Sequence, residues 1–334
     1  MPSDRPILTD PLNRQINYLR ISVTDRCNLR CVYCMPSEGV PLLEHADILS
    51  YEEIFRIAEI AVSLGIRKIR LTGGEPLVRR GLVPLVARLA RLPGLADLSL
   101  TTNGTLLREH AGPLRDAGLH RINVSLDTLR PDRYRAITRH GELRDVLDGI
   151  DAAAAAGILP IKINTVTLRE FNADEAADFA RLTLAHPYEI RFIEFMPVGE
   201  HNGWQRDRLV PGDEIRRSLE AQFELEPVAP EGGTAGPGRL YRIRGAAGRI
   251  GFINPMTEHF CHLCNRLRLT PNGRLRTCLF DDGEVDLRAL LRGGAGDAAL
   301  AETIRAAVLR KPPRHPFHDG HGRKCTSGMS RIGG

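Results

Sequence analysis

Two groups of cysteines have the types and spacing that point most directly to chemistry. One reads Cys27-x3-Cys31-x2-Cys34 and the other Cys261-x2-Cys264-x13-Cys278, while Cys325 stands apart. The 334-residue chain contains seven cysteines, and an odd count argues against a framework of disulfides. Thiols grouped in this way more often bind metal.

The first group suits an iron–sulfur cluster. A [4Fe–4S] cluster usually takes four cysteine ligands, so three would leave one iron with an open coordination position. The amine and carboxylate of an amino acid could chelate that iron. A zinc site is the alternative, but the nearest following histidine, His45, lies beyond a proline. Unliganded core cysteines are the other alternative.

The second group allows two interpretations. A structural zinc site with His259 or His262 as the fourth ligand stays open on spacing alone. Arg266 and Arg268 favour a second cluster with an open iron, because in an extended run both side chains point to one face. A structural zinc site has no need of two guanidinium groups, whereas a cluster that faces an anionic substrate would use them.

The elements that must position these residues repeat one theme of strand, turn and helix. The expected strands are 18–23, 68–72, 97–101, 121–126, 161–166 and 189–195. A helix is expected from Ser50, where Ser50 and Glu53 form a capping box. This alternation predicts a parallel sheet with right-handed crossovers. Polar residues at nearly every strand's carboxyl end favour a partial barrel over a doubly wound sheet.

The chain changes character after Pro197. We expect a helix over 211–223, a Pro/Gly-rich stretch over 227–238 and a hairpin of 240–244 with 249–253. Helices near 285–291 and 298–309 and an extended tail over 312–334 follow. The predicted fold is α/β: a partial (βα)6 TIM-like barrel in residues 1–210, with an α+β extension in residues 211–334 that carries the second cysteine group.

Composition is that of a soluble globular protein, with 42% hydrophobic and 26% charged residues. No apolar run reaches the length of a membrane span, so no membrane association is expected. Met1–Leu12 carries charges and prolines instead of an apolar signal core, and we expect a cytoplasmic protein. The net charge of +5 is modest; arginines at strand ends and beside cysteines suit a small anion better than nucleic acid.

The first cysteine group resembles the radical S-adenosylmethionine superfamily, because it follows the first strand and has an aromatic residue, Tyr33, before its last cysteine. Gly73-Gly74-Glu75-Pro76 after the second strand is similar to the Gly-Gly-Glu-Pro motif of that superfamily. The glycines would let the backbone approach the methionine moiety closely, and carbonyls with a carboxylate would hold its ammonium.

The chain from Arg20 to Gly334 resembles the GTP 3′,8-cyclase family of molybdenum-cofactor biosynthesis. The further residues that carry this likeness are Arg266-Leu267-Arg268, Glu194-Phe195-Met196-Pro197 and the terminal Gly333-Gly334. The resemblance implies a [4Fe–4S] cluster on each cysteine group and S-adenosylmethionine against Tyr33, Gly74, Ser125 and Met196. It implies GTP contacts from Arg20, Arg70, Thr101, Lys162, Arg266 and Arg268, with Arg191 a further candidate, and a catalytic role for Gly333 and Gly334.

The resemblance also implies a reaction. A flavodoxin- or ferredoxin-type donor supplies one electron, and S-adenosylmethionine splits into methionine and a 5′-deoxyadenosyl radical. That radical takes the ribose 3′ hydrogen of GTP, and the 3′ carbon bonds to C8 of guanine. Reduction and protonation give (8S)-3′,8-cyclo-7,8-dihydroguanosine 5′-triphosphate, which a cyclic pyranopterin monophosphate synthase consumes. The family suggests a homodimer.

Other expectations concern single residues and rival functions. Lys162 alternates with isoleucines and would point into the barrel, where an unpaired ammonium is costly and a triphosphate would neutralise it. Cys325 has no assigned role. The rival functions are a peptide-modifying radical enzyme with an auxiliary cluster, and a zinc-stabilised nucleotide- or RNA-binding module without catalysis.

Overall fold

A computed structural model describes residues 7–200, 202–229, 238–315, 317 and 325–333. One 12-stranded sheet runs in the order β12-β11-β10-β1-β2-β3-β4-β5-β6-β9-β8-β7. The eight strands β10, β1–β6 and β9 are parallel to one another. Their bounds are β1 Tyr18–Ser22, β2 Lys68–Thr72, β3 Asp97–Thr102, β4 Arg121–Ser125, β5 Lys162–Thr167, β6 Glu189–Glu194, β9 Arg249–Ile253 and β10 Arg266–Leu269.

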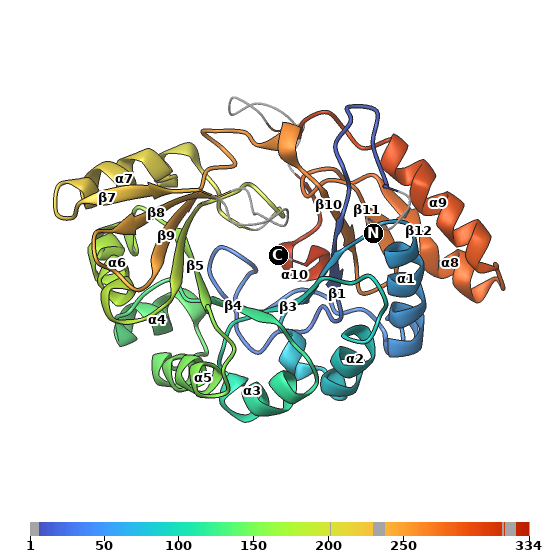
Figure 1. Ribbon diagram of the computed structural model, residues 1–334, viewed down its shortest axis with the longest axis horizontal. Coiled ribbons are helices and arrows are strands. Elements are labelled where there is room, and N and C mark those ends of the chain that lie inside the picture. Colours follow the sequence, from blue (N-terminus) through green and yellow to red (C-terminus); the bar gives the residue numbers. More distant parts are fainter. Residues whose placement is uncertain (1–6, 201, 230–237, 316, 318–324, 334) are drawn as a thin grey trace.

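Antiparallel strands continue the sheet at both edges, and helices cover its outer face. The added strands are β7 Leu225–Val228, β8 Arg239–Ile243, β11 Arg274–Arg276 and β12 Glu284–Asp286. Figure 1 shows the helices around the outside of the curved sheet and α10 inside the curve. The helices are α1 Tyr51–Ser63, α2 Leu82–Leu89, α3 Leu107–Asp116, α4 Pro131–Thr138, α5 Leu143–Ala155, α6 Ala176–Ala185, α7 Gly212–Glu220, α8 Leu287–Arg292, α9 Asp297–Leu309 and α10 Met329–Ile332.

Local sequence explains how these elements form. Helix α1 begins at the capping box of Ser50 and Glu53, which satisfies backbone amides that a helix start leaves unpaired. Its residues Ile54 and Ile57 are buried against the sheet. The outward faces of the strands form one continuous apolar core with the helices, so the inward faces are free to carry polar side chains.

All six expected barrel strands are confirmed, and the extension adds two more parallel strands to them. β10 pairs with β1 and β9 pairs with β6, because edge strands expose backbone groups that need partners. The expected hairpin is β8 and β9. Strand β7 was not expected, and the tail is helical at α10 where it was predicted to be extended. Most of the stretch 227–238 lies outside the described residues.

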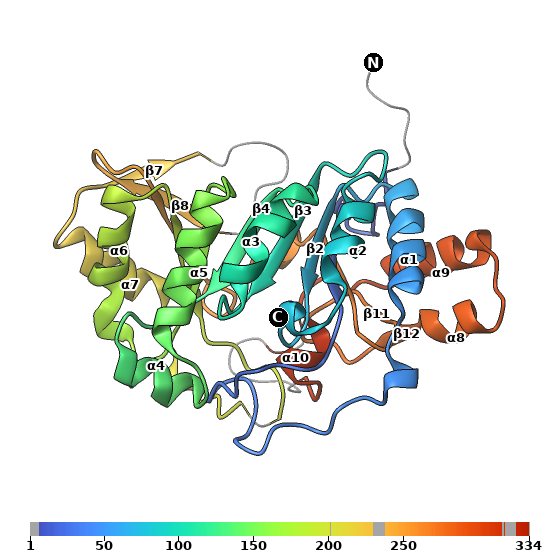
Figure 2. The ribbon, with the colours of Figure 1, turned by 90° about the horizontal axis from the view of Figure 1, so that it is seen from below.

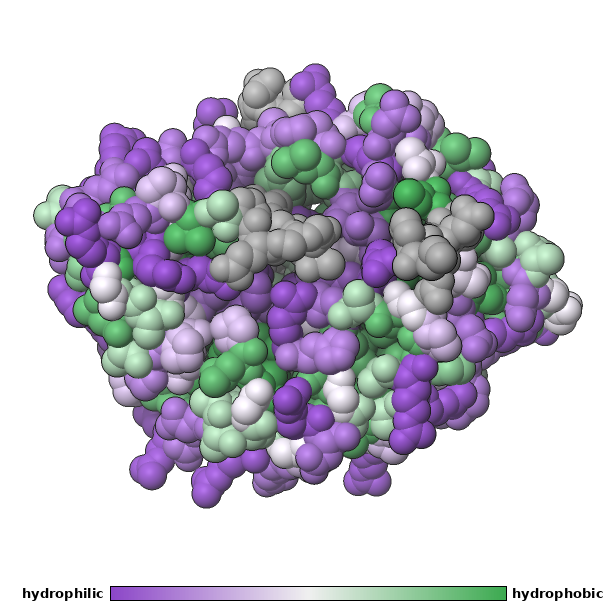
Figure 3. All heavy atoms as spheres, in the orientation of Figure 1, coloured by the Kyte–Doolittle hydropathy of each residue, from purple (hydrophilic) through white to green (hydrophobic). Residues whose placement is uncertain are grey.

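The loops that follow the strands gather at one end of the barrel. Figure 2 shows the long loop after β1 and helix α10 at the same, lower end. The face seen in Figure 3 is mostly hydrophilic, with apolar residues in small separate groups. Among the described residues, no helix has both the length and the apolar character that crossing a membrane requires.

Candidate active site

A cavity of about 540 Å³ lies inside the curve of the sheet. Both cysteine groups line it, as do all the residues expected to contact S-adenosylmethionine or GTP: Tyr33, Gly74, Ser125, Met196, Arg20, Arg70, Thr101, Lys162, Arg191, Arg266 and Arg268. The fold therefore brings together two motifs that are more than 200 residues apart in the sequence. A cavity of this size accommodates a small ligand.

Strand register aligns the cations along one wall of this cavity. Arg20 on β1 pairs in register with Arg268 on β10 and with Arg70 on β2. One row away, Tyr18 lies between Arg266 and Lys68. Side chains two residues apart on a strand share a face, so both rows point into the cavity. Parallel pairing thus turns separate arginines into one positively charged wall.

Burial and the closely spaced charges shift the pKa values of the groups in this wall. Burial lowers the pKa of the Arg20 guanidinium well below its ordinary value, with Arg268 adding to the shift. Burial and Arg266 lower the pKa of Arg268 to about 10. Burial alone would raise the pKa of Tyr18, but Arg70 and Arg20 outweigh it and lower the pKa to about 8. A dianionic or trianionic ligand would relieve this repulsion.

A buried carboxylate holds the second set of cations. Glu189 on β6 lies 3.1 Å from Lys162 Nζ and accepts a 2.6 Å hydrogen bond from Arg191 Nε. Arg249 on β9 lies 3.8 Å from the same carboxylate. Lys162 lines the cavity, as expected, and it has a counter-charge within the protein because pairing of β5 with β6 sets Glu189 beside it. Two or three cations around one carboxylate still leave net positive charge for an anion.

The first cysteine loop packs directly against the Gly-Gly turn. A Cβ on Gly74 would lie 2.4 Å from the carbonyl oxygen of Arg26, and the Gly74 amide donates to Thr24. The glycine is thus required by the cysteine loop itself. Glu75 was expected to help hold an ammonium, but it is fully buried and accepts hydrogen bonds from Thr102 Oγ1 and the Asn103 amide. The Glu75 carboxylate therefore stabilises the Gly-Gly turn.

Tyr33 connects this loop to β4. Its hydroxyl donates a 2.5 Å hydrogen bond to Asp127, which follows β4 and also accepts from the Val166 amide. Burial raises the pKa of Asp127 to about 6. Burial likewise raises the pKa of Cys27 to about 11 and that of Cys34 to about 12. Metal ligation needs thiolates, so a metal bound here must displace these protons.

The second cysteine loop has cationic surroundings. Lys311 Nζ donates to the carbonyl oxygen of Arg266, and it also donates to that of Thr277. Burial would raise the pKa of Cys264, but Lys311 and Arg266 outweigh it, so the pKa is lowered. In the part of the chain that the structure describes, no three His, Cys, Asp or Glu side chains converge closely enough to hold a single metal ion.

The carboxyl-terminal tail reaches the cavity at α10, where Met329 and Ser330 line it. The carbonyl oxygen of Gly333 accepts a hydrogen bond from Arg268. Gly333 has a φ of 72°, and a Cβ there would lie 2.4 Å from Thr72 Oγ1, so only glycine fits. Gly334 lies outside the described residues. Cys325, to which no role was assigned, is buried and hydrogen-bonded with Arg276 and Asp282.

Comparison with known proteins agrees with this geometry. The radical SAM superfamily matches residues 21–183, and Molybdenum Cofactor Synthesis C matches residues 188–317. The GTP 3′,8-cyclase of Geobacter sulfurreducens is 55% identical over 327 residues, covering 98% of this chain and 99% of the relative. That of Pelotomaculum thermopropionicum is 52% identical, covering 98% and 100%. The chain belongs to the GTP 3′,8-cyclase family.

Solved structures support the fold of this family member. Streptococcus suis SuiB bound to S-adenosylmethionine superposes with a TM-score of 0.61 at 14% identity, covering 91% of this chain and 74% of that one. SuiB without a named ligand gives 0.62, covering 94% and 78%. At this identity the likeness concerns the fold alone.

Several residues that line the cavity were not predicted from the sequence. They are Tyr18, Lys68, Arg121, Asp127, Glu189 and Arg249. Lys68 and Glu189 each precede a predicted contact residue by two positions, Arg70 and Arg191, so strand alternation alone placed them on the same face. Arg249 has no such neighbour, because its strand joins the barrel only through its pairing with β6.

Proposed function

We propose that this chain converts GTP to (8S)-3′,8-cyclo-7,8-dihydroguanosine 5′-triphosphate as a radical S-adenosylmethionine enzyme, the first step of molybdenum-cofactor biosynthesis. The observation that carries the proposal is the positive wall of Arg268, Arg20 and Arg70 in a cavity lined by both cysteine groups. Relatives that are 52–55% identical to this chain over 98% of its length bear the GTP 3′,8-cyclase name.

We assign the reductive half of the chemistry to the first cysteine group. Cys27, Cys31 and Cys34 would hold a [4Fe–4S] cluster, and such a cluster would supply the electron for the cleavage of S-adenosylmethionine. Gly74 presents backbone with no side chain in the way, and Tyr33 is fixed by Asp127. Ser125 and Met196 line the same cavity. These residues would orient the methionine and adenosine parts of the ligand and exclude water.

We assign substrate binding to the second cysteine group and the cations that line the cavity. Cys261, Cys264 and Cys278 would hold a second [4Fe–4S] cluster, for which the cationic surroundings of Lys311 and Arg266 are suitable because they favour thiolates. The triphosphate would lie against Arg20, Arg70, Lys162 and Arg191, with Arg266, Arg268 and Thr101 completing the contacts. Guanidinium groups suit phosphate because their bonds are charge-assisted and often bidentate.

The remaining assignments concern partners and setting. We propose an external flavodoxin- or ferredoxin-type donor, delivery of the product to cyclic pyranopterin monophosphate synthase, and a homodimer in the cytoplasm. The free thiols of all seven cysteines suit a reducing compartment. We also propose two domains: residues 1–210 form the barrel core, and residues 211–334 form the extension that carries the second cluster. Gly333 and Gly334 would complete the active site.

Anaerobic incubation with dithionite, S-adenosylmethionine and GTP tests the function. We expect 5′-deoxyadenosine and a cyclised GTP product in step with each other. Formation of 5′-deoxyadenosine without modified GTP would retain the radical chemistry and refute the substrate. A colourless protein purified anaerobically, with zinc in place of about eight irons per chain, would instead support the nucleotide- or RNA-binding alternative.

A further inference from the structure

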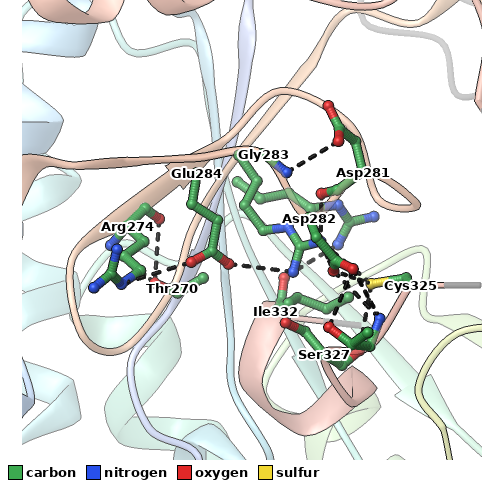
Figure 4. A network of polar contacts seen from close by, with 12 residues as sticks. Thr270, Arg274, Asp281, Asp282, Gly283, Glu284, Cys325, Ser327 and Ile332 are labelled. Atoms are coloured by element: carbon green, nitrogen blue, oxygen red, sulfur yellow. Dashed lines mark hydrogen bonds and ion pairs between the residues drawn. The ribbon is translucent and has the colours of Figure 1, made fainter.

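A polar network joins the second cysteine loop to the carboxyl-terminal tail (Figure 4). At its centre Arg276, on β11 just before Cys278, is fully buried. Its Nη2 lies 3.1 Å from Asp282 Oδ1 and 3.2 Å from Cys325 Sγ, and its Nη1 lies 3.3 Å from Glu284. A buried guanidinium that faces two carboxylates is expensive to remove, because both carboxylates would then lose their counter-charge.

Asp282, like Arg276, reaches the tail. Its carboxylate accepts hydrogen bonds of 3.1 Å from both the backbone amide and the hydroxyl of Thr326, and one of 3.2 Å from Cys325 Sγ. On the opposite side, the Gly199 amide donates to the Cys325 carbonyl at 3.0 Å. Residues 325–326 are therefore held between the loop after Cys278 and the loop after β6.

From this anchor the tail runs into the active-site cavity. Ile332 is 1% exposed and packs among Phe195, Phe280 and other apolar side chains. Ser330 lines the cavity, and its backbone amide hydrogen-bonds to Cys34 of the first cysteine group. Gly333 then meets Arg268. The same short segment thus touches the first cysteine group and the cationic wall, while it is anchored on the loop of the second group.

We infer that Arg276 and Asp282 are positioning residues that hold the tail so that Gly333 stays against Arg268 and Ser330 against Cys34. Among the hydrogen bonds of the described residues, they bond to Cys325 but to none of the six cysteines assigned to clusters, and they act through residues 325–326. The inference rests on the proposed function in one respect: the tail takes part in GTP turnover. Loss of the Asp282 charge removes charge-assisted bonds from the anchor, and the tail would then leave the cavity for part of the time.

The test compares three single variants in the reconstituted full-length protein. Asp282→Asn removes the charge of the anchor, Thr326→Val removes a tail hydroxyl that binds it, and Asp281→Asn is the matched control. Among the described residues, the Asp281 side chain bonds only within its own loop, to the Gly283 amide. Hydrogen–deuterium exchange of the peptide that contains residues 329–333 reports tail anchoring without any turnover, and iron content reports the clusters.

For Asp282→Asn and Thr326→Val we expect faster exchange in this peptide and GTP turnover lowered about tenfold, with iron content and S-adenosylmethionine affinity unchanged. Asp281→Asn should match the parent protein. Unchanged tail exchange in both variants, or faster exchange with full turnover, overturns the inference. If Asp282→Asn loses iron, Thr326→Val decides, since Thr326 is remote in sequence from all the cluster cysteines. Absence of GTP turnover in the parent protein would refute the proposed function while the exchange result still stands.

Discussion

The pH dependence of GTP binding should report the protonation state of the Lys162 side chain. Burial, followed by the nearby charge of Arg191, lowers the pKa of this ammonium to about 7, against the opposing effect of Glu189. Arg121 on the neighbouring strand adds to the lowering. A triphosphate seated against Lys162 would favour the charged form and raise this pKa. Because the bound form holds its proton more tightly than the free form, binding should be strongest below pH 7 and weaken above it.

The size of the effect follows from the fraction of protonated Lys162 in the free protein. With a pKa of about 7, half of the molecules carry the proton at pH 7 and about one in 33 at pH 8.5. If only the protonated form binds tightly, the dissociation constant rises about 16-fold over this interval. Binding should take up about 0.5 proton per GTP at pH 7 and about one at pH 8.5.

Isothermal titration calorimetry in buffers of different ionisation enthalpy measures both quantities. Lys162→Arg is the matched control, since arginine stays protonated throughout this range. The γ-phosphate of GTP also titrates, and the same contribution in parent and variant cancels in their ratio. An equal pH dependence in Lys162→Arg, or no proton uptake by the parent protein at pH 8.5, would refute the assignment of Lys162 to the triphosphate.

Three further outcomes are expected. Glu189→Gln removes the carboxylate that the buried cations share, so it should lower the free energy of unfolding by about 3 kcal/mol. In thermal melts, saturating GTP should stabilise this variant more than the parent protein, and equal stabilisation would contradict the reasoning. Tyr18→Phe removes a buried hydroxyl that has no hydrogen-bond partner among the described residues, so steady-state kinetics should show a higher KM for GTP with little change in kcat. Cys278→Ser should lower the iron content from about eight to about four per chain, whereas Cys325→Ser should leave it unchanged, and elemental analysis distinguishes the two.

The local features of this protein were readable from its sequence. Strand and helix periodicity predicted the six barrel strands and α1 because each depends on neighbouring residues alone. The cysteine spacings and the Gly-Gly turn were equally local, and they carried the family resemblance. The family of the chain is therefore a property of its linear sequence.

Tertiary structure decided which charges meet. Arg268 lies beside Arg20 because β10 adds to the edge of β1 in a particular register, and Lys162 is paired because β6 sets Glu189 opposite it. Neither pairing could be predicted from residue spacing, since the side-chain pattern of a strand does not determine which strand it pairs with. The hydrogen bonding of Cys325 and the position of Gly333 beside Arg268 likewise depend on contacts between distant parts of the chain. The cysteine motifs could be recognised from their spacing, whereas the surroundings that tune and close the site arise only when distant strands hydrogen-bond in register.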